Sequence, residues 1–71
     1  MTISERENIV QLFEKYGAML TQTQRQCFQL SFFEDLSLSE ISEIVASTRS
    51  AVHDAIKKAI KKLKDIEKKI G

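Results

Sequence analysis

The stretch LSLSEISEIVASTRSAVHDAIKKAIKK, residues 36–62, decides the fold of this 71-residue chain. Within it, Ser37 and Glu40 have the spacing of a capping box, and apolar residues at helical spacing follow through Val45. A second helical period begins after Thr48, across a short break that contains neither glycine nor proline. Two helices that meet in this way are typical of a helix-turn-helix motif, which we place at about 38–60.

The second helix of the motif is predicted to be long. Thr48 is a natural N-cap, and no glycine or proline follows until Gly71. The helix should therefore span about 49–70, or roughly 33 Å.

Two further helices are expected before the motif. Ser4 with Glu7 predicts one helix start, and Gly17 predicts its end through a left-handed conformation; the alternative is a helix that Ala18 and Met19 extend by one turn. Thr21 begins a second helix over 22–33. With no proline and two glycines, residues 1–71 are expected to form a single all-α domain of four helices.

Several functional classes have no support in the residues. The single cysteine, Cys27, and the single histidine, His53, cannot form a disulfide or a usual zinc site. No glycine-rich phosphate loop or nucleophile–base pattern is present, so we expect no catalytic residues, cofactor or metal, and interpret Cys27 as a buried small apolar residue. No apolar run has the length of a signal peptide or a membrane span, so we expect a cytoplasmic protein that does not insert into membranes.

Charge is distributed unevenly along the chain, although the net charge is only +1. Residues 1–48 carry three basic and seven acidic side chains, a balance of −4. Residues 49–71 carry eight basic and three acidic side chains, a balance of +5. The long helix is therefore cationic and could meet phosphate, an acidic protein surface or only water.

The first outward turns of the long helix are candidates for contact with nucleic acid or another partner. Arginine can recognise guanine through two hydrogen bonds, and lysines can neutralise phosphates. Asp54 would repel phosphate unless it pairs with Lys57 or Lys58, and the lysines could equally form a solvated face. The candidate contact residues are Thr48, Arg49, Ser50, His53, Asp54, Lys57, Lys58 and Lys61.

An apolar stripe with heptad spacing runs along the same helix. It consists of Val52, Ile56, Ala59, Leu63, Ile66 and Ile70. Leaving Leu63, Ile66 and Ile70 in water would forfeit about 1.5–3 kcal/mol each. These three residues could form a homodimer through the long helix, or the helix could pack on Ile9 and Phe13 of its own chain.

The stretch LTQTQRQCFQLSFFEDLSLSEISEIVASTRSAVHDAIKKAIKKL, residues 20–63, resembles region 4 of bacterial sigma factors. It resembles more closely the YlxM family of small helix-turn-helix proteins, and NIVQLFEKYGAML, residues 8–20, looks like the opening helix of that family. Ala46 stands at the turn position where relatives favour glycine, and Ser47 follows where they have an apolar residue. Family members usually have a longer C-terminal region, which this chain is expected to lack.

The resemblance implies a cytoplasmic protein whose genes neighbour those of the signal recognition particle GTPase and its receptor. It thereby implies a non-enzymatic regulator or adaptor of that targeting pathway, with the particle's protein or RNA as partner. The alternative is a DNA-binding transcriptional regulator that uses the long helix to read the major groove. A third hypothesis is a structural module that only dimerises.

Overall fold

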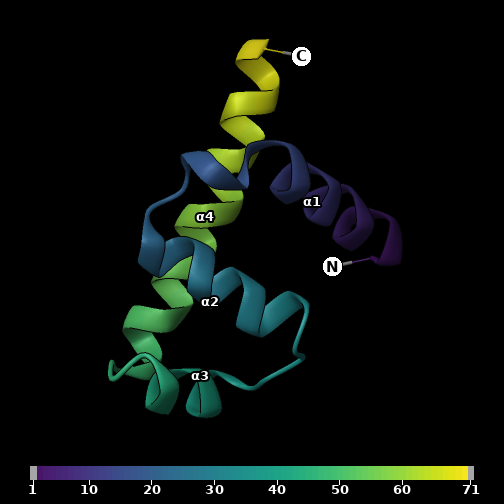
Figure 1. The fold of residues 1–71 in the computed structure, drawn as a ribbon. Coiled ribbons are helices and arrows are strands. Elements are labelled where there is room, and N and C mark those ends of the chain that lie inside the picture. Colours follow the sequence, from purple (N-terminus) through teal and green to yellow (C-terminus); the bar gives the residue numbers. More distant parts are fainter. Residues whose placement is uncertain (1, 71) are drawn as a thin grey trace.

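The computed structural model describes residues 2–70 and confirms the predicted all-α, four-helix class. The α-helices are α1 (Ile3–Tyr16), α2 (Gln22–Phe32), α3 (Leu38–Ile44) and α4 (Arg49–Ile70), and the short 3-10 helix η1 (Gly17–Met19) follows α1. Figure 1 shows α4 running the length of the molecule, with α3 beside its first turns and α2 crossing its middle. No helix of the described chain, residues 2–70, has the length and apolar character needed to cross a bilayer.

Local hydrogen bonds at the helix starts explain why α2 and α3 begin where the sequence predicts. The hydroxyl of Thr21 accepts from the Gln24 N–H at 3.1 Å, and the Gln24 side chain accepts from the Thr21 N–H at 3.2 Å. Ser37 and Glu40 form the same reciprocal pair at 3.2 and 3.0 Å. Each pair satisfies two N–H groups that have no partner within the helix.

The predicted start of the first helix was wrong. Its N-cap is Thr2, whose hydroxyl accepts from the Glu5 N–H at 3.1 Å, and Ser4 lies inside the first turn. The sequence contains two overlapping patterns with the same spacing, Thr2 with Glu5 and Ser4 with Glu7. The structure uses the earlier of the two.

The predicted conformation of Gly17 was also wrong. Its φ is −57°, in the right-handed region, and the chain continues as η1, so the alternative of one further turn is the observed one. A Cβ atom at this buried position would lie 3.2 Å from the Phe13 ring. Gly17 therefore lies in close contact with the Phe13 ring and does not make a left-handed turn.

The core is divided into two clusters that α4 joins. The larger cluster packs α1, α2 and α4 together, and its buried members are Ile9, Leu12, Phe13, Leu20, Phe28, Ala59 and Leu63. Phe28 lies at its centre, stacked on Phe13 at 4.5 Å and on Phe32 at 4.2 Å between ring centroids. The smaller cluster contains Cys27, Ile41 and Val52, so α2, α3 and α4 meet there. Burial of Cys27 agrees with its interpretation as a small apolar residue.

Candidate nucleic-acid interface

The turn between α3 and α4 sets the position of the candidate interface. Ala46 adopts a left-handed conformation with a φ of 54°, and the Ser47 N–H donates to the Ser42 carbonyl at 2.9 Å. This is the bonding pattern that commonly ends a helix at a glycine. Ala46 thus occupies a left-handed turn position at which glycine was expected. This conformation costs alanine about 1–2 kcal/mol of conformational energy.

Thr48 caps α4, as predicted from the sequence. Its hydroxyl accepts from the Ala51 N–H at 3.1 Å. One turn after this cap, Val52 is buried against Ile41 of α3. This contact fixes which face of α4 points into the core. Arg49, Ser50 and His53 are consequently exposed.

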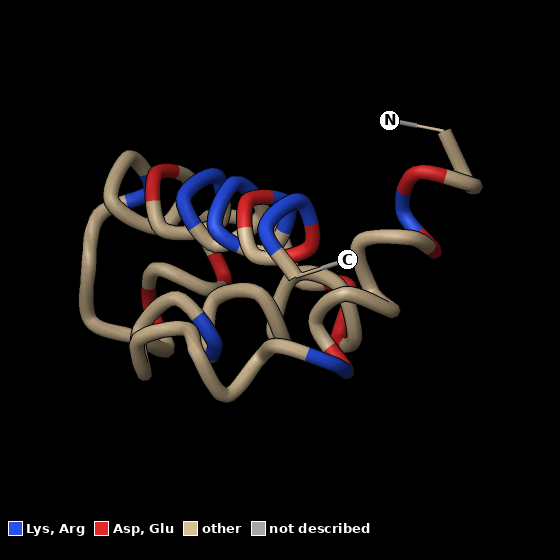
Figure 2. The backbone as a smooth tube through the Cα atoms, turned by 90° about the horizontal axis from the view of Figure 1, so that it is seen from above, with Lys and Arg blue, Asp and Glu red and all other residues tan. Residues whose placement is uncertain are grey.

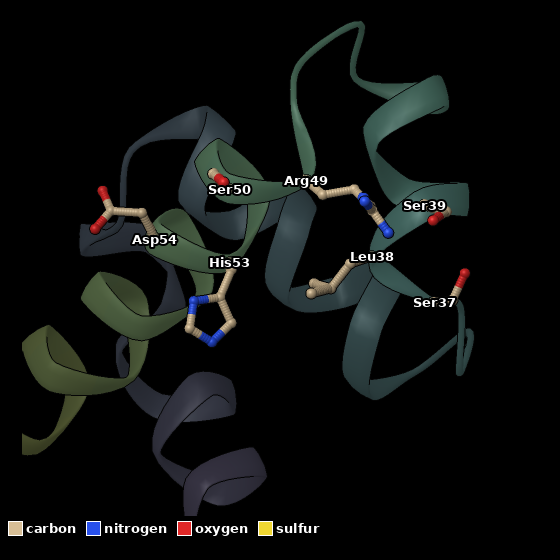
Figure 3. Close-up of a pocket in the computed structure, with 7 residues that line it drawn as sticks. All are labelled: Ser37, Leu38, Ser39, Arg49, Ser50, His53 and Asp54. Carbon is tan, nitrogen blue, oxygen red and sulfur yellow. The ribbon is translucent and has the colours of Figure 1, made fainter.

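An open groove of about 650 Å³ lies between the first turns of α3 and α4. It is lined by Ser37, Leu38, Ser39, Arg49, Ser50, His53 and Asp54. Figure 3 shows the Arg49 side chain reaching toward α3, whereas Asp54 points away from the other labelled residues. The structure thus brings together four of the predicted contact residues, Arg49, Ser50, His53 and Asp54, at one concave surface.

Sequence reasoning missed the contribution of α3 to this groove. Ser37 and Ser39 line it, but the sequence indicated only a capping role for Ser37 and none for Ser39. Their neighbours across the groove are ten or more positions further along the chain, so the crossing of α3 and α4 decides their proximity. A signal was present in the motif itself, because the first helix of a helix-turn-helix lies across the backbone of bound DNA.

Asp54 pairs with Lys58, which is one of the two pairings considered from the sequence. The Lys58 Nζ atom lies 3.0 Å from Asp54 Oδ2, and both side chains are more than half exposed. Such a pair is worth little energetically in water, but it offsets the negative charge beside the groove. Thr48 is not among the residues that line the groove, so a phosphate contact from its side chain stays a prediction.

Lys57 and Lys61 lie together on α4, beyond the groove. They line a second depression of about 380 Å³ with Ile60, Lys64 and Asp65. Figure 2 shows basic residues gathered along α4, while most acidic residues lie outside that helix. Lys64 was not among the predicted contact residues, although its spacing of three from Lys61 could have identified it.

The apolar stripe on α4 is covered by the chain itself over most of its length. Leu63 is fully buried in the larger cluster with Ile9 and Phe13. Of the two options that the sequence left open, packing within the chain is therefore the observed one for this residue. Leu63 therefore cannot lie on an association surface of the folded chain. Ile66 is half-buried and Ile70 is 64% exposed, so a role for these two in self-association stays a prediction.

Within the described part of the chain, three ionisable groups are perturbed by their surroundings. Hydrogen bonding from Ser37 lowers the pKa of the Glu40 carboxyl, which favours the charged form at the start of α3. Burial raises the pKa of the Cys27 thiol and thereby suppresses its thiolate. Desolvation, followed by hydrogen bonding to Glu67, raises the pKa of Tyr16.

Comparison with known proteins places these features in a family. A family described as "Putative helix-turn-helix protein, YlxM / p13 like" (UPF0122) matches residues 3–71. A UPF0122 protein of Caldanaerobacter subterraneus subsp. tengcongensis is 45% identical over 60 residues, which are 84% of this chain and 51% of that protein. UPF0122 proteins of Clostridium novyi and Desulforamulus reducens are 41% and 42% identical over 69 residues, 97% of this chain and 60% and 59% of theirs. The chain spans between half and two thirds of the length of these relatives. It belongs to the UPF0122 family of YlxM/p13-like helix-turn-helix proteins.

Proposed function

We propose that this protein is a non-enzymatic regulator of the signal recognition particle pathway, acting in the cytoplasm and binding nucleic acid through the groove between α3 and α4. The assignment to this pathway is supported by the resemblance to the YlxM family. The contact surface rests on the geometry of the groove. The main observation that supports nucleic-acid binding is the exposure of Arg49, Ser50 and His53 on the first turns of α4. These residues lie opposite Ser37 and Ser39 of α3.

The chemistry of the groove suits an anionic, hydrogen-bonding partner. Arg49 offers a planar group with five N–H donors, which matches phosphate or the edge of guanine. The serine hydroxyls can donate or accept, and the His53 ring can donate through an N–H group. Phosphate contacts would position the molecule, and the few groups that reach base edges would supply any sequence preference.

Binding measurements with three ligands in parallel test this proposal. The ligands are the signal recognition particle RNA, its GTPase and a random DNA duplex, each measured over a range of salt concentrations. We expect the RNA to bind with an affinity that falls steeply as salt rises, because cations are released from the phosphates. Binding to the GTPase alone, without salt-sensitive nucleic-acid binding, would contradict the assigned surface.

The alternative function is transcriptional regulation through duplex DNA, and the family's helix-turn-helix description favours it as the second candidate. In that case one DNA sequence should bind more tightly than random duplex, and Arg49→Ala should relax the preference at about one base position. An adaptor that contacts protein alone would show neither effect.

A further inference from the structure

A single line of side chains continues from the α3–α4 groove along the whole of α4. Its members are Ser50, His53, Lys57, Lys61, Lys64 and Lys68, spaced by three or four residues. Because an α-helix has 3.6 residues per turn, these positions lie on one face. All six are exposed. The last four form what we call the lysine stripe: Lys57, Lys61, Lys64 and Lys68.

The lysine stripe differs from the other lysines of α4. Lys58 is paired with Asp54, and the other ion pair of residues 2–70 joins Arg6 to Asp35, so no stripe lysine has a carboxylate partner within that range. Lys62 and Lys69 lie about 120° around the helix from the centre of the stripe. The chain therefore holds four lysines in one line with no ion pair among residues 2–70, and Asp65 lies beside three of them in the second depression.

The dimensions of the stripe suit a nucleic-acid backbone. Lys57 and Lys68 are eleven residues apart, or about 16 Å along the helix axis. A DNA strand carries one phosphate per about 3.4 Å of duplex axis, so several phosphates of one strand lie within that length. Ile60 is half-buried beside Lys57 and Lys61. Lysine is depleted from the centres of protein interfaces, which argues against a protein partner here.

We propose that the lysine stripe is a phosphate-contacting extension of the α3–α4 groove, so that α4 follows one nucleic-acid strand well beyond the helix-turn-helix motif. This inference rests on the proposed nucleic-acid binding and deepens it. The groove would supply any sequence preference, and the stripe would supply sequence-independent affinity. The partner is then a nucleic acid long enough to extend past the turns that line the groove.

Two double variants with the same change in charge test the stripe. Lys64→Gln with Lys68→Gln removes two charges from it, and Lys62→Gln with Lys69→Gln removes two charges from the same helical turns on another side. Glutamine retains good helix propensity, and circular dichroism checks folding. Affinities are measured by fluorescence anisotropy over a salt series, with a 20-base-pair DNA duplex and an RNA hairpin of similar length.

We expect the stripe variant to reduce the slope of log affinity against log salt by about 1.8 on duplex DNA, and affinity at 0.1 M salt by roughly tenfold to a hundredfold. The control variant should retain nearly the full slope. Equal losses of affinity and slope in both variants would show that binding depends only on net charge. That result would overturn the proposed role of the lysine stripe but not the proposed function. Failure of the unaltered protein to bind either nucleic acid would overturn both proposals.

A fourth outcome would distinguish a protein partner from a nucleic-acid partner. If the stripe variant binds nucleic acid normally but loses binding to the signal recognition particle GTPase, the stripe contacts protein and the inference is wrong.

Discussion

The carboxylate of Asp54 lies 3.0 Å from the ammonium group of Lys58, one turn further along α4. Among residues 2–70, Lys58 is the α4 cation that forms an ion pair. Lys58 is engaged by a carboxylate, whereas Lys57 and Lys61 face a separate depression with Lys64. Lys58 is thus already paired within α4, whereas Lys57, Lys61 and Lys64 can contact an anionic partner.

Replacing Asp54 should strengthen nucleic-acid binding. In Asp54→Asn, a carboxylate beside the groove is lost and Lys58 is released, so we expect affinity to rise roughly threefold to tenfold at 0.1 M salt. Fluorescence anisotropy with the duplex and hairpin measures the change. Glu14→Gln, on the exposed side of α1, removes the same charge far from the groove and serves as the control. An equal gain in both variants would attribute the effect to net charge alone.

Replacing Ala46 with glycine should stabilise the protein. The left-handed conformation at φ 54° is strained for alanine but not for glycine, so Ala46→Gly should raise the free energy of unfolding by about 1 kcal/mol. Urea denaturation followed by circular dichroism provides the measurement. Ala18→Gly, in η1 and without a positive φ, should instead leave stability unchanged or lower it. A decrease in Ala46→Gly would show that the strain is absent.

The Glu40 carboxyl should make stability depend on pH in acid. Its pKa is lower in the folded chain than the ordinary 4.5, so it stabilises the fold above that value and loses this contribution as pH falls through the folded value. Glu40→Gln can keep the hydrogen bond from Ser37 but cannot titrate. We therefore expect Glu40→Gln to be less stable than the unaltered protein at pH 7 and to match it near pH 3.

Urea midpoints at the two pH values measure this difference. Glu43→Gln, an exposed carboxylate on the same helix, is the control for loss of charge. A constant difference between Glu40→Gln and the unaltered protein at both pH values would contradict the role of Glu40.

Self-association through the end of α4 remains a proposal with a direct test. Ile70 is 64% exposed, and burying it in a dimer would contribute about 1.5–3 kcal/mol. Ile70→Asp should then raise the dimer dissociation constant by at least about tenfold. Sedimentation equilibrium over a range of concentrations measures it, with Ile3→Asp on α1 as the matched control. A mass that stays monomeric at every concentration would remove the proposal.

Helix starts were the features most accessible from sequence. The caps at Thr21, Ser37 and Thr48 each depend on hydrogen bonds that span three residues, so a short window contains all the information. Thr2 and Ser4 show where this breaks down. Two caps with the same spacing compete there, and local pattern alone did not identify the one that is used.

Residues that act through packing were less accessible. Gly17 suggested a left-handed turn, but it has a right-handed φ and lies against the Phe13 ring, whose position depends on the stacked phenylalanines of α1 and α2. Leu63 could have faced a second chain or α1. The choice depended on where α1 crosses α4, and no local pattern contains that angle.

The candidate interface shows the same division. From its sequence alone, this protein is all-helical, places a cap before a long cationic helix, and presents Arg49, Ser50 and His53 on the first turns of that helix, because each property follows from hydrogen bonds and periodicity within a few residues. Only the tertiary structure brings Ser37 and Ser39 opposite Arg49 and buries Leu63. Those outcomes depend on the rotation and crossing of whole helices, which packing of the two core clusters determines over the full length of the chain.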